Sequence, residues 1–420
     1  MQGSYFQTAA FTQAEPDLAG FQMTVKLASG ETVSVPVAEV TVQAGSAIDA
    51  TDAPVLHVAS AEAATKLKAD DVKGHVVAIQ LQRDSTNLRS FNQLLRTLQG
   101  LKPAALLVID QSNGPRVPMR STVLRDASAP KLSQPYVIVR TPALQALLKE
   151  KSAATASLHV NAAKETPVTL RNVAGILRGS DPALRDTYIL VTSHYDHIGV
   201  ASEGEDRIYN GANDDGSGTI SVIEIAQALA QLPVKPKRSI LFMTYFGEEK
   251  GLLGSRYFGA HPTVPLSQIV ADMNLEQVGR TDSPEGSHKD LLEITGRTFS
   301  DVVKVIGEAA AITGQRVENE DKNSDAFFSR SDNQALADQG IPAHTVCVAY
   351  EFPDYHKVGD SADKIDYANM ARTDRTITLA VWMIAENPQA PQWSAAEPKA
   401  SKYLEAYKKL HPAATSPGRE

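Results

Sequence analysis

The chain has 420 residues, of which 42% are hydrophobic, and its Gly and Pro usage is ordinary, so disorder and collagen-like repeats are excluded. This length exceeds one compact core and favours two or three units. The formal net charge of -8 argues against nucleic acid as a partner, because a phosphate-binding protein would carry clustered Lys and Arg. The longest apolar runs are strand-sized, so no membrane span is predicted.

The first 165 residues predict a small, β-rich α/β unit that has no cluster of His, Asp and Glu. We expect strands at residues 75–81, 104–109 and 136–139, and helices at residues 88–98 and 142–149.

After residue 165, strand and helix patterns alternate regularly. Expected strands lie at residues 172–177, 188–192, 239–245, 269–275 and 344–348, and expected helices lie at residues 219–232 and 301–313. Such alternation predicts an α/β fold with a mostly parallel, helix-covered sheet, into which the smaller unit is inserted. A Pro- and Ala-rich stretch at residues 387–398 predicts a linker to a tail helix at residues 399–410.

Ionisable residues follow the ends of these strands. The segments are SHYDH (residues 193–197), NGANDDGSG (210–218), GEE (247–249), NLE (274–276) and DYHK (354–357). Alone, each is most simply a surface pair or a turn. In an open α/β sheet, however, ligands bind outside the carboxyl ends of the strands, so we expect these five loops to converge.

The convergent residues predict a zinc centre. They are His194, Asp214, Glu249, Glu276 and His356. This mixture of nitrogen and oxygen ligands suits Zn²⁺ better than Mg²⁺ or Ca²⁺. Two divalent ions are balanced by three carboxylates and one hydroxide, so we expect two Zn²⁺ ions roughly 3.5 to 4 Å apart, bridged by a carboxylate and a water. The single cysteine, Cys347, lies in an apolar run and excludes a Cys-based zinc site.

Geometry also suggests catalytic roles. Asp196 follows His194 by two residues and is expected to fix its imidazole tautomer. Adjacent side chains diverge, so one of Glu248 and Glu249 should bind metal while the other takes a proton from the water and passes it to a leaving amine. Tyr355 is expected to donate a hydrogen bond to the developing oxyanion. The predicted reaction is metal-assisted hydrolysis of an amide.

These segments, together with FGEEKGLLGS (residues 246–255) and DSADKID (360–366), resemble zinc metallopeptidase family 28, the double-zinc aminopeptidases, over about residues 166–386. The resemblance implies that His194 and Glu276 bind one zinc, Glu249 and His356 the other, that Asp214 bridges them, and that Glu248 is the general base. It also implies a cis peptide bond between Asp214 and Asp215. Many members carry Asp where Glu276 stands, so Asp272 is a rival ligand.

The resemblance further implies a domain organisation. Residues 1–44 would be strands of the catalytic domain, 45–151 a protease-associated domain, 152–392 the catalytic domain and 393–420 a tail. The second assignment rests on GHVVAI (74–79) and KPAALLVI (102–109), with an unrelated α/β insertion as the alternative. In relatives, this domain lies over the active site, and helices and usually an export signal precede the stretch that resembles residues 3–7. Export is therefore expected, although residues 1–6 lack a signal-peptide pattern and the helices are expected to be missing.

The resulting prediction is a zinc-dependent aminopeptidase that acts on peptides with a free N-terminus. The alternatives are a carboxypeptidase or dipeptidase, in which Arg330 would meet the substrate carboxylate, and a non-catalytic receptor-like module. A glutaminyl cyclase-like transferase is disfavoured by the full ligand set. Residues 327–332 are expected to line the substrate pocket, with Asp332 or a nearby carboxylate close to the α-amino group. His197 is expected to be structural or to support a ligand. The oligomeric state is not predicted.

Overall fold

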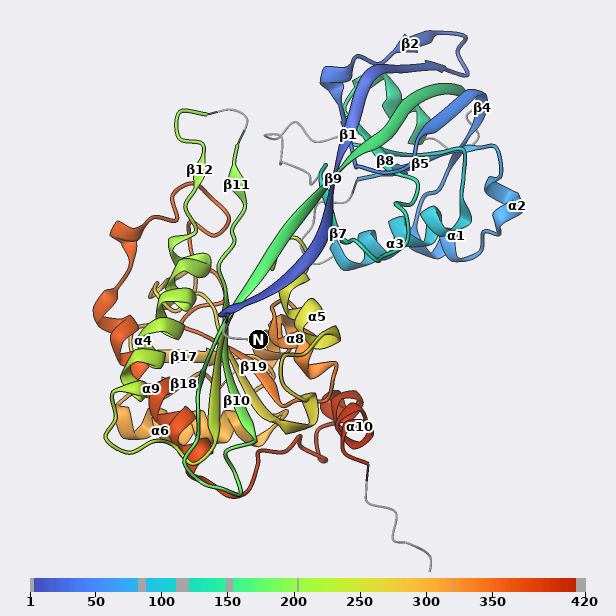
Figure 1. The fold of residues 1–420 in the computed structure, drawn as a ribbon. Coiled ribbons are helices and arrows are strands. Elements are labelled where there is room, and N and C mark those ends of the chain that lie inside the picture. The colour runs from blue at the N-terminus through green and yellow to red at the C-terminus, as the bar shows by residue number, and fades with distance from the viewer. Residues whose placement is uncertain are drawn as a thin grey trace, which may run out of the picture. The chain divides into compact units, whose positions relative to one another are not determined.

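The structure is a computed structural model that describes residues 4–81, 88–110, 121–148, 154–201, 204–319 and 321–412. The chain forms two compact units, which we call the C-terminal unit (Met1–Ala9 with Leu170–Glu420) and the N-terminal unit (Ala10–Thr169) (Figure 1). These limits differ from the expected boundaries at residues 45 and 151. Both limits fall inside the long strands β1 (Phe6–Lys26) and β9 (Thr155–Leu177). A continuous strand has no Pro-, Gly- or Ser-rich linker, so the sequence pattern could not reveal the limits of the two units.

A single sheet forms the centre of the C-terminal unit, in the order β18-β17-β19-β14-β10-β13-β9. Its strands besides β9 are β10 (Tyr188–His194), β13 (Ser239–Tyr245), β14 (Ile269–Leu275), β17 (Leu291–Ile294), β18 (Arg316–Val317) and β19 (Ala343–Cys347). The four central strands β13, β10, β14 and β19 are parallel, whereas β9 pairs antiparallel with β13, and β17 pairs antiparallel with β19 and parallel with β18. The predicted mostly parallel sheet is confirmed.

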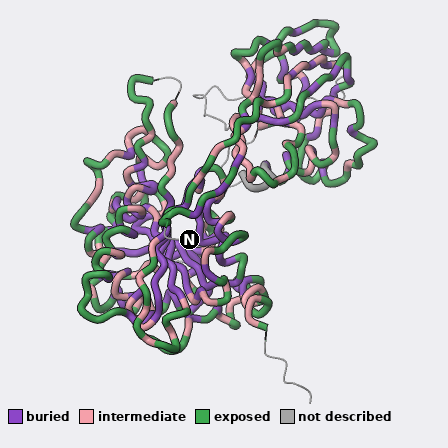
Figure 2. Tube along the Cα trace, viewed as in Figure 1, coloured by how far each residue is buried: buried purple, intermediate pink, exposed green. Residues whose placement is uncertain are grey.

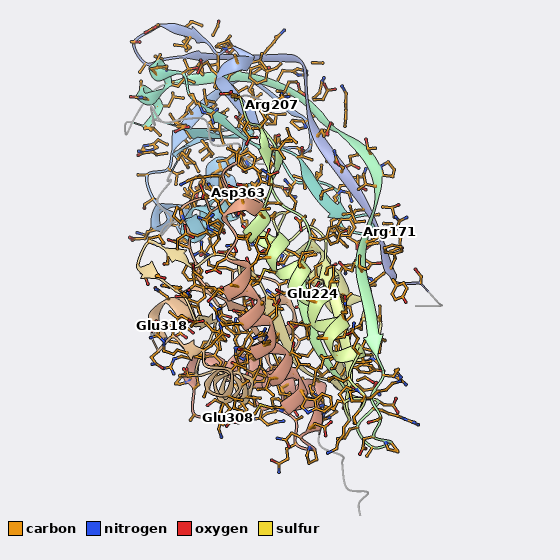
Figure 3. The ribbon with its side chains drawn as sticks, turned by 90° about the vertical axis from the view of Figure 1, so that its left-hand side faces the viewer. Arg171, Arg207, Glu224, Glu308, Glu318 and Asp363 are labelled. Carbon is orange, nitrogen blue, oxygen red and sulfur yellow. The ribbon has the colours of Figure 1, made fainter. Side chains whose placement is uncertain are left out.

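Helices cover both faces of this sheet. The first face packs against α4 (Gly218–Ala230), α6 (Asp301–Thr313) and α9 (Tyr367–Glu386), and the second against α5 (Leu253–Ala260), α8 (Asn333–Ala337) and α10 (Ser401–Leu410). Along β10, Ile189 and Val191 face the first helix layer and Leu190 faces the second, so every residue of this strand is buried (Figure 2). Figure 3 shows α4 and α9 side by side, with the exposed Glu224 on α4. The result is a three-layer α/β sandwich.

Shorter elements complete the C-terminal unit. They are the hairpins β11 (Gly199–Val200) with β12 (Ile208–Tyr209) and β15 (Asp282–Ser283) with β16 (Gly286–Ser287), the helix α7 (Asp321–Phe327), and the single turns η3 (Ala212–Ser217), η4 (Leu266–Gln268), η5 (Ala362–Lys364) and η6 (Pro398–Ala400).

The main helices begin and end where the sequence supplies caps. The Ser300 hydroxyl accepts a hydrogen bond from the Val302 N–H at the start of α6, and Asp366 accepts one from Asn369 at the start of α9. Helix α6 is followed by Gly314, whose φ of 83° is a left-handed conformation that favours glycine.

The tail helix expected at residues 399–410 is present as α10, but it and the expected linker pack into the core through buried aromatic side chains. Trp393 is 3% exposed, its ring stacks on Tyr403 of α10 at 5.0 Å, and its Nε1–H donates to the carbonyl of Gly340. Phe328 also packs in this cluster. Trp393 and Tyr403 anchor the Pro-rich stretch to the second face of the sheet. The composition of this stretch gave no sign of such packing.

The N-terminal unit has its own sheet and core. Its strands besides β1 are β2 (Thr32–Ser34), β3 (Val40–Val42), β4 (Ile48–His57), β5 (Val76–Gln80), β6 (Ala105–Ile109), β7 (Val123–Asp126) and β8 (Tyr136–Val139), and its helical elements are α1 (Ala61–Thr65), α2 (Ala69–Val72), α3 (Leu88–Leu101), η1 (Val37–Glu39) and η2 (Pro142–Leu148). The expected helix at 142–149 is a 3₁₀ helix, and residue 149 lies outside the described residues. Strands β4, β5, β6 and β8 are parallel neighbours. Among the described residues of the whole chain, no helix is long and apolar enough to cross a membrane.

Candidate metal centre

The structure brings the five expected ligand residues together at the carboxyl ends of the parallel strands. Nε2 of His194, the last residue of β10, lies 3.4 Å from Oδ1 of Asp214 and 4.0 Å from Oε1 of Glu276. Nε2 of His356 lies 3.1 Å from Oδ2 of Asp214 and 3.2 Å from Oε1 of Glu249. Asp214 therefore presents one oxygen to each of two groups of side chains.

A further residue joins the second group. His197, which was expected to be structural or supporting, places Nδ1 3.0 Å from Oε1 of Glu249. Asp214 therefore belongs to two groups of three ligand residues, one with His194 and Glu276 and one with His197 and Glu249. Within each group, the ligand atoms lie within 4.8 Å of one another.

The residues present fit a bound metal ion. Nε2 of His194, Oδ2 of Asp214 and Nδ1 of His197 are buried and take part in no hydrogen bond with the described residues, although other ligand atoms lie within 4 Å. Buried polar atoms in native proteins are nearly always satisfied, so converging atoms without hydrogen bonds indicate space for a cation. Imidazole and carboxylate donors are ligands that zinc accepts.

The rival ligand Asp272 does not join the centre. Its side chain is fully buried, and Oδ1 accepts a hydrogen bond from the Thr192 hydroxyl. Burial raises the pKa of the Asp272 carboxyl to about 8, so it is protonated at neutral pH. Glu276 begins the loop after β14 and lies beside His194 instead.

Asp196 acts differently from the expectation. The Nδ1–H of His194 donates to the backbone carbonyl of Asp196 at 3.0 Å, whereas the Asp196 carboxylate lies 3.7 Å away. The carbonyl can only accept, so Nε2 keeps its lone pair for a metal. The Asp196 carboxylate accepts hydrogen bonds from the backbone N–H groups of Glu248 and Glu249 at 2.9 and 3.3 Å. It thus holds the turn that carries both glutamates.

Two aspartates without a predicted role shape the loop around Asp214. Asp215 accepts hydrogen bonds from the backbone N–H groups of His194 and Gly218, and Asp360 accepts from those of Asn213 and Asp214. The peptide bond between Asp214 and Asp215 is cis, as the family resemblance implied. Both aspartates belong to the segments at residues 210–218 and 360–366, but only the folded loop reveals which amides they bind.

The adjacent glutamates Glu248 and Glu249 differ in their affinity for protons. Burial and the nearby Glu276 raise the pKa of Glu248 well above its ordinary value. Burial also acts to raise the pKa of Glu249, but the imidazoles of His197 and His356, which lie 3.0 and 3.2 Å from its Oε1, outweigh burial and lower that pKa. Paired carboxyls whose environments push their pKa values apart suit different roles, one as a base and one as a charged ligand.

A cavity beside the centre contains some of the residues expected to meet substrate. Its lining includes Glu276, Phe327, Arg330, Tyr350 and Tyr355. The Tyr355 ring stacks on His356 with centroids 4.0 Å apart, and the Arg330 guanidinium lies over the Phe327 ring.

Asp332 does not face this cavity. Its side chain is fully buried and accepts a hydrogen bond from the Ser255 hydroxyl. The expectation that Asp332 itself meets the substrate's α-amino group is therefore wrong, whereas the alternative, a nearby carboxylate, stays a prediction.

The helix-covered sheet and the carboxylate shared between two ligand groups define an α/β fold with a candidate metal centre at the edge of its sheet. The model of Peptidase family M28 matches residues 172–381, half of the chain. The chain belongs to peptidase family M28.

Named relatives agree with this assignment. Aminopeptidase YwaD of Bacillus subtilis is 24% identical over 302 residues, which cover 69% of this chain and 59% of that protein. A probable zinc metalloprotease of Pyrenophora teres f. teres is 25% identical over 240 residues, covering 54% and 50%. The chain thus spans about half the length of the curated relatives it matches.

Solved structures show the same fold. An aminopeptidase from Aneurinibacillus sp. strain AM-1 superimposes with a TM-score of 0.61 at 21% identity, covering 94% of this chain and 87% of that one. The zinc aminopeptidase BSAP from Bacillus subtilis gives a TM-score of 0.57 at 20% identity, with coverages of 94% and 86%.

Proposed function

We propose that this chain is an aminopeptidase that uses two zinc ions to remove N-terminal residues from peptides. The observation that carries the proposal is that Asp214 lies between two groups of side chains, His194 with Glu276 and Glu249 with His356. A second support is that relatives in the family, including YwaD, are named aminopeptidases.

In this proposal, His194, Asp214 and Glu276 would hold one zinc, and Asp214, Glu249 and His356 the other. Bound zinc would polarise the scissile carbonyl and lower the pKa of the attacking water toward ~7.

The chain's own groups then move the proton. Glu248, whose backbone is held by Asp196, has a raised pKa, so it accepts a proton from the attacking water and passes it to the leaving amine. Burial and the surrounding carboxylates raise the pKa of Tyr355, so its hydroxyl stays protonated and can donate a hydrogen bond to the carbonyl oxygen.

A carboxypeptidase or dipeptidase is the second candidate, favoured by one observation. Arg330 lines the cavity that also contains Glu276 and Tyr355, where a guanidinium could bind a substrate carboxylate. A non-catalytic module is disfavoured, because the ligand residues and Glu248 are all retained.

We also propose that the N-terminal unit is a protease-associated domain and that the protein is exported. The first is supported by its separate β-rich α/β core, and the second rests on the family resemblance alone.

The test combines metal content with substrate scope. We would measure zinc in the purified protein and the hydrolysis of three substrate sets: free-amino amides, N-blocked amides and N-blocked peptides with a free carboxylate. Two zinc ions, and chelator-sensitive cleavage confined to free-amino amides, would support the aminopeptidase. Cleavage of N-blocked peptides only when they carry a free carboxylate would favour the carboxypeptidase. A protein without zinc would refute both.

A further inference from the structure

His197 and His356 both approach the same two carboxylate oxygens, one of Asp214 and one of Glu249. Its Nδ1 lies 3.0 Å from Oε1 of Glu249 and 3.9 Å from Oδ2 of Asp214, and Nε2 of His356 lies 3.2 and 3.1 Å from the same two oxygens. The two imidazole rings meet at 76° with centroids 5.7 Å apart. Two nitrogens therefore approach one pair of oxygens from different directions.

The contact between His197 and Glu249 is close but is not a hydrogen bond. Neither ring nitrogen of His197 makes a hydrogen bond with the described residues, although its side chain is only 8% exposed. A nitrogen 3.0 Å from a carboxylate oxygen without hydrogen-bond geometry is expected when both atoms point toward a common ion rather than toward each other.

The loop that carries Asp214 also fixes the ring of His197. Gly211 has a φ of 63°, and a Cβ atom at this position would lie 2.6 Å from Cγ and 2.8 Å from Cβ of His197. The backbone at Gly211 therefore packs directly against the imidazole, and only glycine leaves it room. One loop thus positions both Asp214 and His197.

We propose that His197 is a fourth protein ligand of the second zinc, through Nδ1. This inference rests on the proposed two-zinc function. The second zinc would then have four protein ligands, His197, His356, Asp214 and Glu249, the number found in closed structural sites. The first zinc would have three, His194, Asp214 and Glu276, and would keep the open position that catalytic sites need. The two metals are therefore unequal: the first exchanges ligands and the second anchors the site.

An alternative role for His197 is to orient Glu249 by donating a hydrogen bond. His197→Asn separates the two roles. The amide nitrogen of Asn can take the place of Nδ1 as a donor, but a neutral amide is not among the usual zinc ligands. A positioning role should therefore survive this substitution, whereas a ligand role should not.

The experiment measures zinc bound per chain after equilibration in graded zinc buffers. The matched control is His159→Asn, because His159 also pairs through Nδ1 with a carboxylate, Asp49, but lies exposed in the N-terminal unit. We expect the second zinc of His197→Asn to bind at least ~100-fold more weakly, since loss of a supporting partner alone costs about 10- to 100-fold. The first zinc, and both zincs of His159→Asn, should bind as in the wild type.

A second measurement needs no substitution. X-ray absorption of the zinc-loaded wild type counts imidazole ligands, and we expect three shared by two zinc ions instead of two. Two zincs with two imidazoles, or wild-type zinc affinity in His197→Asn, would overturn the role of His197 and leave the proposed function standing. A wild type that binds fewer than two zincs would overturn both.

Discussion

Replacing the proposed base is the most direct test of the mechanism. Glu248→Gln keeps the size of the side chain and removes its ability to accept a proton. Its backbone N–H donates to Asp196 at 2.9 Å, a bond that the substitution does not touch, so the turn that carries Glu249 should stay in place. The variant should therefore fold and bind zinc as the wild type does.

The size of the effect follows from the role. General acid–base catalysis contributes about 10²- to 10⁴-fold, and each factor of ten corresponds to about 1.4 kcal/mol in the barrier. We expect kcat to fall by that factor, which is about 2.7 to 5.4 kcal/mol. KM should change little, because Glu248 acts in the transition state and not in holding the substrate.

The assay is hydrolysis of a free-amino aminoacyl amide, with zinc content measured on the same samples. Glu308→Gln is the matched control, because Glu308 is an exposed carboxylate on α6 (Figure 3). It should behave as the wild type. Near-normal kcat in a Glu248→Gln protein with full zinc content would refute the assignment, and loss of zinc would show that Glu248 is a ligand instead.

Three further predictions concern stability. Chelation should lower the thermal midpoint and zinc but not Mg²⁺ should restore it, because a metal at a hundredfold excess over its Kd stabilises the folded state by about 2.7 kcal/mol. Asp272 has a folded pKa of about 8, above its ordinary value, so its contribution is complete below about pH 4 and is lost as pH rises toward 8. Urea unfolding of the metal-free protein between pH 6 and 8 should show this loss, up to about 1.4 kcal/mol per pH unit, and Asp272→Asn should remove it. Trp393→Ala should reduce the free energy of unfolding by about 3 to 5 kcal/mol, because Trp393 is buried against Phe328 and Tyr403.

Each of these has a clear contrary result. A midpoint insensitive to chelation would contradict the metal centre. Equal pH slopes for the wild type and Asp272→Asn would mean that Asp272 is ionised in the folded protein. A Trp393→Ala variant as stable as the wild type would return residues 387–412 to the status of a loosely attached tail.

The central sheet was predictable because its strands are apolar runs bounded by turns and helices. The runs at residues 188–192, 239–245 and 269–275 each end at a polar segment, and each is a buried parallel strand. The limits between the units and the burial of the C-terminal segment depend on long-range packing, so the sequence pattern did not reveal them. Strands β1 and β9 continue across the limits between units, and Trp393 buries a segment whose composition is typical of a linker.

In the candidate site, too, the sequence predicted some features and long-range packing determined others. The strand-end motifs located the residues that converge, because the position of a residue after a strand determines the edge of the sheet to which it belongs. The contacts of His197 depend on the path of the loop at Gly211, which is distant in sequence. The observed role of Asp196 depends on the turn at residues 247–249 reaching its carboxylate. Neither contact leaves a local pattern.

The long strands β1 and β9 also impose an order on folding. Residues 5–7 are held in the C-terminal unit by residues that follow the whole N-terminal unit: the Asn172 side chain donates to Gln7, 165 residues earlier, and the Ala174 N–H donates to the Tyr5 carbonyl. Closing a flexible loop of that length costs about 4.5 kcal/mol from its length dependence. A folded N-terminal unit shortens the free path between these residues, so Tyr5 and Gln7 find their partners most easily after the inserted unit has formed.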